Sequence, residues 1–275
     1  MSETPLAAVL AGMPPEENVF GLRTGLPDDT AGWELCSAVT RARFARWEDD
    51  AARYMRREFG GTHPLATSGH TLGWYASIAG YVGGTFFRRA RRVPRLSADV
   101  LAFRFAEEGP WPDAIALLDD RFWCLPDDPA AGHPAAGPVA DAGALAALLR
   151  GQVAAFREET LGRVRPSARL PRRTLRGVFT DGLDIGLWLG GPSSVADAPQ
   201  ILRDAALVLP GGAPELLEPT SVYVLTDGRG RRHLSRRRIG CCYSYRLPGD
   251  DILACATCPR VDDEERAARH TAYDT

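Results

Sequence analysis

Four of the six cysteines in this chain of 275 residues lie close together near its C-terminus. Cys241 and Cys242 are adjacent, and Cys255 and Cys258 form a C-x-x-C pair after a Pro-Gly turn. Thiolate sulfur binds zinc and iron, and two thiols can also form a disulfide. These residues therefore predict a zinc site, an iron–sulfur cluster or a pair of disulfides.

The spacing within the two pairs helps to separate these chemistries. The turn in a C-x-x-C pair directs both sulfurs to one side, so Cys255 and Cys258 can bind one metal ion together. Neighbouring side chains of an extended chain point to opposite faces, so Cys241 and Cys242 converge only where the backbone kinks, which Gly240 would permit. A zinc ribbon normally has C-x-x-C at both ends, whereas a two-iron cluster is broader. We therefore favour iron–sulfur and keep structural zinc as the alternative.

The composition is that of a globular protein in a reducing compartment. Apolar residues make up 45% and charged residues 25% of the chain, and its net charge of −2 argues against nucleic-acid binding through a broad basic field. The N-terminus lacks the basic region of a signal peptide, and no apolar stretch approaches the ~20 residues of a membrane span. We expect a cytoplasmic protein, in which clustered cysteines bind metal more often than they form disulfides. A thiol–disulfide site is disfavoured because a proline and a polar tail follow the C-x-x-C pair.

Hydrophobic periodicity predicts a helix-rich body. In residues 33–59, Phe44, Trp47, Ala51 and Tyr54 recur at helical spacing, which indicates one amphipathic helix. Further helices are predicted over 63–92, 144–161, 174–189 and 196–209.

Strands are predicted in the middle and near the end of the chain. Residues 99–106 and 113–125 are expected to form strands separated by a turn. Residues 126–143, rich in proline and glycine, are expected to form a surface loop. Residues 221–237 read as a β-hairpin with Asp227-Gly228 in its turn.

These elements predict an α+β fold, with a helix-rich body, a small antiparallel sheet and a C-terminal cysteine-bearing loop region. We divide the chain into a loosely ordered N-terminal segment (1–30), the body (31–235), the cysteine segment (236–262) and a polar tail (263–275). The hairpin at the end of the body leads directly into the cysteine segment and must therefore position it.

The stretch RRRIGCCYSYRLPGDDILACATCP resembles the C-terminal signature of the ferric siderophore reductase (FhuF-like) family. That signature has basic residues, an adjacent cysteine pair, a Y-R-L-P-G segment and C-x-x-C-P. The resemblance implies four ligands to a [2Fe–2S] cluster, namely Cys241, Cys242, Cys255 and Cys258. Twelve residues separate the two pairs, two more than is usual in the family, and the extension falls in a loop where added length costs little. The body resembles the family only in its organisation.

The resemblance also implies a function, the reduction of ferric iron held in a siderophore, typically a hydroxamate, in the cytoplasm. Hydroxamate oxygens are hard anionic donors that hold Fe(III) far better than Fe(II), so one electron loosens the complex. Plant-type [2Fe–2S] centres lie at roughly −400 mV, the right region for such a donor. We find no dinucleotide or flavin motif, so a separate flavoprotein or ferredoxin-type partner is expected to supply electrons.

Arginines surround the cysteines in sequence. Arg236, Arg237, Arg238 and Arg246, with Arg260, are expected to tune the cluster or to attract an anionic donor protein. Two other functions remain open. One is a zinc-stabilised siderophore-binding or assembly protein without redox activity, and the other is a [2Fe–2S] carrier or redox sensor with another acceptor.

Other residues that could do chemistry have simpler interpretations. Cys36 and Cys124 lie in apolar surroundings and are expected to be core residues. His63 and His70 lack a spaced partner and are expected to be structural or solvent-facing. Trp74, Trp111 and Trp188 could line a siderophore pocket, but core packing is the more usual role of tryptophan.

Overall fold

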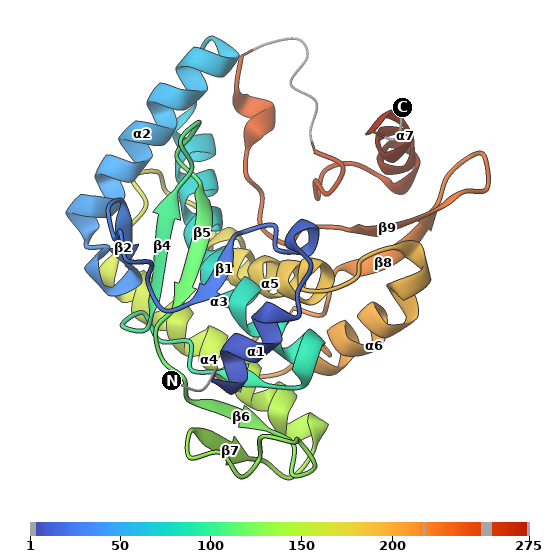
Figure 1. Ribbon diagram of the computed structural model, residues 1–275. Coiled ribbons are helices and arrows are strands. Elements are labelled where there is room, and N and C mark those ends of the chain that lie inside the picture. The colour runs from blue at the N-terminus through green and yellow to red at the C-terminus, as the bar shows by residue number, and fades with distance from the viewer. Residues whose placement is uncertain (1–3, 217, 249–254, 274–275) are drawn as a thin grey trace.

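The computed structural model describes residues 4–216, 218–248 and 255–273 (Figure 1). Its fold is α+β, as the sequence predicts, with long helices packed together and small sheets of two to four strands around them. Among the described residues, no helix is both long and apolar enough to cross a membrane.

Two helices, α3 (Pro64–Ala90) and α5 (Arg172–Leu189), form the centre of the body, in agreement with the predicted ranges. They cross in close contact because glycines face each other. A Cβ atom at Gly80 would lie 2.3 Å from the backbone of Gly182. One at Gly84 would lie 2.5 Å from the backbone of Gly186. This contact accounts for glycines inside buried helices, where each lowers helix propensity.

Helix α2 (Arg41–Phe59) is shorter than predicted. Residues 33–38 instead form strand β2 (Trp33–Leu35) and a 3-10 turn, η2 (Cys36–Ala38). The helix begins after Thr40, whose hydroxyl accepts a hydrogen bond from the Arg43 N–H (3.3 Å). This cap stops the helix from extending toward the N-terminus. The predicted apolar face is correct, since Phe44, Trp47 and Ala51 are fully buried and Tyr54 is partly buried.

The main sheet has the order β1-β5-β4-β2, with β1 parallel and the other pairings antiparallel. Its further strands are β1 (Leu22–Thr24), β4 (Leu101–Phe105) and β5 (Pro112–Leu117). The strand predicted over 113–125 is two strands, because a turn around Asp119 separates β5 from β6 (Phe122–Cys124). Strand β6 pairs with β3 (Val93–Pro94) and with β7 (Ala136–Pro138), which lies inside the predicted surface loop.

The remaining body elements follow the predictions closely. Helices α4 (Ala142–Arg163) and α6 (Ala198–Val208) cover the central pair, with a short 3-10 turn, η3 (Val195–Asp197), before α6. Strands β8 (Val222–Thr226) and β9 (Arg232–Arg236) form the predicted hairpin. Its five-residue loop places Gly230 in the left-handed region (φ 76°).

Short helices form near both ends of the described chain. Helix α1 (Pro5–Ala11) buries Leu6 completely, and a 3-10 turn, η1 (Pro15–Glu17), follows it. The polar tail forms helix α7 (Asp263–Tyr273). Buried apolar residues, Leu6, Met13 and Leu22, contact the body from this part of the chain.

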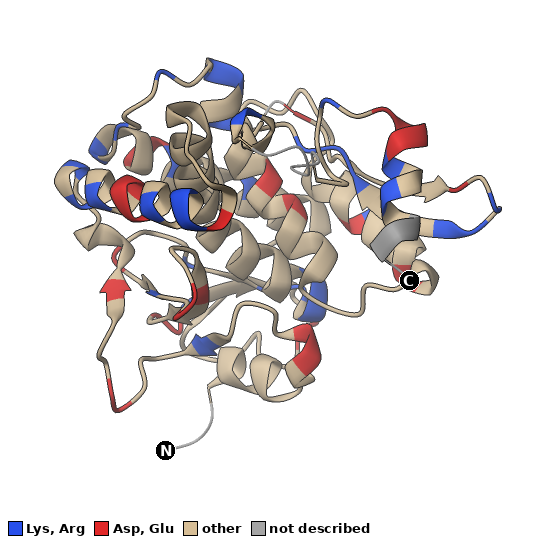
Figure 2. Ribbon diagram, turned by 90° about the horizontal axis from the view of Figure 1, so that it is seen from above, with Lys and Arg blue, Asp and Glu red and all other residues tan. Residues whose placement is uncertain are grey.

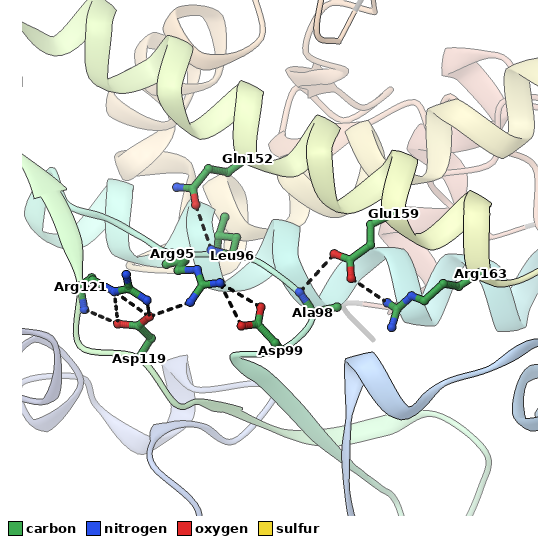
Figure 3. A network of polar contacts seen from close by, with 9 residues as sticks. All are labelled: Arg95, Leu96, Ala98, Asp99, Asp119, Arg121, Gln152, Glu159 and Arg163. Carbon is green, nitrogen blue, oxygen red and sulfur yellow. Dashed lines mark hydrogen bonds and ion pairs between the residues drawn. The ribbon is translucent and has the colours of Figure 1, made fainter.

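The segment between α3 and β4 is fixed by polar contacts to α4 (Figure 3). The amide of Gln152 accepts from the Leu96 N–H (3.0 Å). It also donates to the Pro94 carbonyl (2.9 Å). Arg95 forms an ion pair with Asp119 (3.2 Å). These contacts connect the sheet side of the body to its helices.

Candidate metal centre

The cysteine segment begins where β9 ends and lies against α5 (Figure 1). The carboxylate of Asp181, on α5, accepts hydrogen bonds from the N–H groups of Ile239 (2.8 Å) and Gly240 (2.7 Å). The N–H of Arg238 donates to the carbonyl of Thr257 (2.9 Å). This last bond joins the backbone before the first cysteine pair to the C-x-x-C turn, so the two pairs come together.

Glycines in both central helices let this segment approach them closely. A Cβ atom at Gly177 of α5 would lie 2.4 Å from Cγ2 of Ile239. One at Gly69 of α3 would lie 3.2 Å from the carbonyl oxygens of Cys241 and Cys242. The adjacent cysteines therefore rest directly on the backbone of α3.

The kink expected at the adjacent pair lies at Tyr243 and not at Gly240. Tyr243 has φ 61°, and its N–H points to Sγ of Cys241 (3.4 Å). A hydrogen bond between the hydroxyls of Tyr243 and Thr174 (3.1 Å) holds this strained residue against α5. Gly240 is required by packing instead, since a Cβ there would lie 2.6 Å from Cγ1 of Val178.

The four predicted cysteines lie in the two segments that the Arg238–Thr257 hydrogen bond joins. Cys242 and Cys258 are buried, whereas Cys241 and Cys255 are half-buried. The hydrogen bond that the Cys255 thiol donates lowers the pKa of Cys242 far below its usual range, although burial opposes this. The same contact raises the pKa of Cys255, and burial raises the pKa of Cys241. A thiolate is the form of cysteine that binds metal.

Two neighbours of Cys242 come from distant parts of the chain. Nε2 of His70 lies 2.8 Å from the hydroxyl of Ser244, which lies 3.2 Å from Sγ of Cys242. Both His70 and Arg238 stabilise the thiolate of Cys242. Burial disfavours the charge of Arg238, yet Cys242 and Asp181 hold its pKa above the usual value. Sequence reasoning missed the role of His70, because no local pattern connects α3 to the cysteines.

An arginine from the polar tail holds the C-x-x-C turn. Arg266, on α7, is fully buried (0% exposed). Its guanidinium donates to the carbonyl oxygens of Arg236, Ala256, Cys258 and Val261. No sequence pattern indicated a role for this residue, because a single arginine in a polar stretch usually faces solvent.

The predicted arginines have different surroundings. Arg236 is buried and donates to the carbonyl of Asp181 (2.7 Å). Arg237 is exposed and forms a surface ion pair with α7 (3.1 Å). Arg246, in the 3-10 turn η4 (Ser244–Arg246), and Arg260 both lie over the ring of one tyrosine.

The other cysteines and His63 have the structural roles expected from the sequence. Cys36 and Cys124 are fully buried in the core, and burial raises the pKa of both thiols. The ring of His63 caps α3 by accepting the Leu65 N–H (3.2 Å).

The chemistry of the donor set fits an iron–sulfur cluster. Within the described residues, no three His, Cys, Asp or Glu side chains are arranged to hold a single metal ion. Among the four thiols, Cys255 donates a hydrogen bond to Cys242, and Cys241 interacts electrostatically with Cys258. Thiolate ligands with a hydrogen-bonding cation nearby are the surroundings that iron–sulfur clusters use in proteins.

The comparison with known families agrees with this chemistry. Residues 238–260 match the family model described as the FhuF 2Fe-2S C-terminal domain, and the match includes all four cysteines. None of the curated proteins matches the chain. The match supports the resemblance inferred from the signature and supports a [2Fe–2S] cluster as the cofactor. The whole of the body (31–235) lies outside the matched residues.

Proposed function

We propose that this chain is a cytoplasmic ferric-siderophore reductase. The observation that carries the proposal is the match of residues 238–260 to the FhuF 2Fe-2S C-terminal domain. Cys241, Cys242, Cys255 and Cys258 would be its ligands, and the body (31–235) would face the siderophore.

The proposed reaction moves one electron. When bound, the cluster supplies an electron at low potential that converts Fe(III) in a hydroxamate complex to Fe(II), which the hydroxamate oxygens hold weakly. A separate flavoprotein or ferredoxin-type protein returns one electron for each iron released. Fe(II) then exchanges out of the complex.

The residues around Cys242 would tune the reduction potential of a cluster bound there. Arg238 and His70 both favour negative charge at the Cys242 thiolate. Positive groups and hydrogen-bond donors beside cluster ligands raise the reduction potential of such centres. Two of the thiols are half-buried, which leaves the site close to the surface.

An exposed basic stretch suits an anionic electron donor. Basic and acidic residues are interspersed along α2 (Figure 2). Residues 163–176, by contrast, contain six arginines and no acidic residue. In the described part of the chain, Arg165, Arg169, Arg172 and Arg173 are exposed and take part in no ion pair. Thr174, next along α5, reaches Tyr243 beside the cysteines.

A single-turnover reaction tests the proposal. The protein, purified and reduced without oxygen, is mixed with a ferric hydroxamate and an Fe(II) chelator. We expect the cluster to reoxidise as about one Fe(II) appears for each cluster, since a [2Fe–2S] centre carries one electron. Reoxidation by ferricyanide but by no ferric siderophore would support a carrier with another acceptor. One zinc and no sulfide per chain would support the zinc-stabilised protein.

A further inference from the structure

A cavity of about 290 Å³ opens between α3, α5 and the start of the cysteine segment. Its lining includes three aromatic side chains, Phe20, Trp74 and Trp111, and three charged ones, Asp181, Arg236 and Arg238. The two indole rings lie 6.3 Å apart between centroids. Trp188, the third tryptophan considered from the sequence, packs elsewhere, against the small apolar cluster of α6 and the hairpin.

One helical glycine keeps this cavity open. Gly73 of α3 lines the cavity, and a Cβ there would meet only the Arg238 guanidinium, at an ordinary contact distance of 3.9 Å. Close helix packing, which requires Gly80 and Gly84, therefore does not require Gly73. Glycine lowers helix propensity. At this position its missing side chain leaves the space beside the helix open. Ser77, one turn further along the same face, also lines the cavity.

Arg238 brings an unused hydrogen-bond donor to the cavity. Its Nε is buried and has no hydrogen-bond acceptor within the described residues, and the nearest carboxylate oxygen, of Asp181, is 4.0 Å away. Asp181 itself is occupied by two backbone N–H groups. Arg236 is likewise engaged with a backbone carbonyl. Of the two lining arginines, Arg238 therefore keeps one donor atom, Nε, without an acceptor among the described residues, and a buried donor without an acceptor is unfavourable.

The same cavity reaches the candidate cluster. His70 and Arg238 line it, and each also interacts with Cys242. A ligand in the cavity is thus separated from a cluster ligand by a single side chain. Such a position suits an electron acceptor.

We propose that this cavity, next to the cysteines, binds one edge of a ferric hydroxamate siderophore, an inference that rests on the proposed function. The apolar spacer of the ligand lies against Trp74 and Trp111, and a hydroxamate oxygen accepts from Arg238. The cavity is at the small end of ligand pockets, so it takes part of the complex and leaves the remainder at the surface. A cluster held by the four cysteines would supply one electron to Fe(III), giving Fe(II), and the external donor would return that electron.

Binding of a complex that cannot be reduced tests the site independently of electron transfer. The probe is the gallium(III) complex of desferrioxamine B, titrated into the cluster-loaded protein by calorimetry. Gly73→Phe fills the cavity without removing a contact, and Trp74→Leu removes an aromatic wall. We expect each variant to weaken binding about tenfold or more. Trp74→Leu loses a well-placed aromatic contact, and Gly73→Phe removes the space for the ligand. Trp188→Phe, outside the cavity, should bind as the wild type does.

Several outcomes would overturn this inference. One is wild-type binding that Gly73→Phe and Trp74→Leu leave unchanged, because the site would then lie elsewhere. Another is binding of flavin mononucleotide that depends on these residues while the gallium complex does not bind, which would make the cavity a donor site. The single-turnover reaction with ferric siderophore reports on the proposed function separately in both cases. Unchanged cluster absorbance in each variant shows that the protein is folded.

Discussion

Each cysteine pair combines one buried thiol with one half-buried thiol, Cys242 with Cys241 and Cys258 with Cys255. Neighbouring groups hold the two buried cysteines in place. The two half-buried cysteines lie nearer to solvent. If the four thiols are the ligands that we propose, each would hold a distinct position at the cluster. None of them repeats the role of another, so the loss of any one should not be compensated.

Replacement of single cysteines by alanine tests the ligand set. We expect Cys241→Ala, Cys242→Ala, Cys255→Ala and Cys258→Ala to reduce iron from about two per chain toward zero, because each iron needs two thiolates. Iron and acid-labile sulfide, measured after purification without oxygen, report the result. Cys36→Ala and Cys124→Ala are the matched controls, since these buried core thiols should lower stability but not cluster content. Full iron in any one of the four variants would remove that residue from the ligand set.

At the scale of the element, α7 is the structural support of the C-x-x-C turn. Its Arg266 donates to carbonyl groups on both sides of Cys258 and at the end of β9. A buried charge is stabilised here by several carbonyl oxygens, which in turn need it as their donor. The last helix therefore connects the second cysteine pair to the hairpin.

Arg266→Met should loosen this turn without unfolding the body. Hydrogen bonds from a charged donor are lost and buried carbonyls are left unpaired, so we expect a loss on the order of 3 kcal/mol in local stability. Faster loss of visible absorbance in the presence of a chelator would report it, with far-ultraviolet circular dichroism little changed. Arg237→Met removes an exposed ion pair from the same region and should cost less than about 1 kcal/mol. Equal rates of cluster loss in the two variants would show that Arg266 does not support the site.

The sequence predicted most elements because their signals are local. The long apolar runs of α3 and α5, the hairpin turn and the cysteine signature are each contained in one stretch of chain. The predicted start of α2 was wrong because the hydrogen-bonded cap at Thr40 begins the helix there, although apolar residues precede it. The contacts of His70 and Arg266 were missed because they join residues far apart in sequence, and a single polar side chain carries no sign of its tertiary partner.

At the scale of the molecule, the distribution of charge matters more than its total. The net charge of −2 gives no overall attraction for an anionic protein. The exposed arginines of residues 163–176 nevertheless concentrate positive charge around the first turn of α5. Local fields of this kind act over roughly 8–10 Å at physiological salt. Electrostatic attraction at this surface would orient a donor toward the cysteines, whereas the interspersed charges of α2 would not.

Charge reversal on this surface should slow reduction by an acidic electron donor. We expect the double variant Arg172→Glu/Arg173→Glu to lower the second-order rate of reduction by a plant-type ferredoxin roughly tenfold at low salt, because electrostatic steering is lost. The wild-type rate should fall as ionic strength rises, and the rate of the variant should change much less. Arg41→Glu/Arg46→Glu changes the charge by the same amount on α2, in exposed positions away from the cysteines, and serves as the control. Dithionite, a small reductant, should reduce all three proteins at similar rates. Equal ferredoxin rates for both double variants would mean that net charge alone, rather than this surface, governs the encounter.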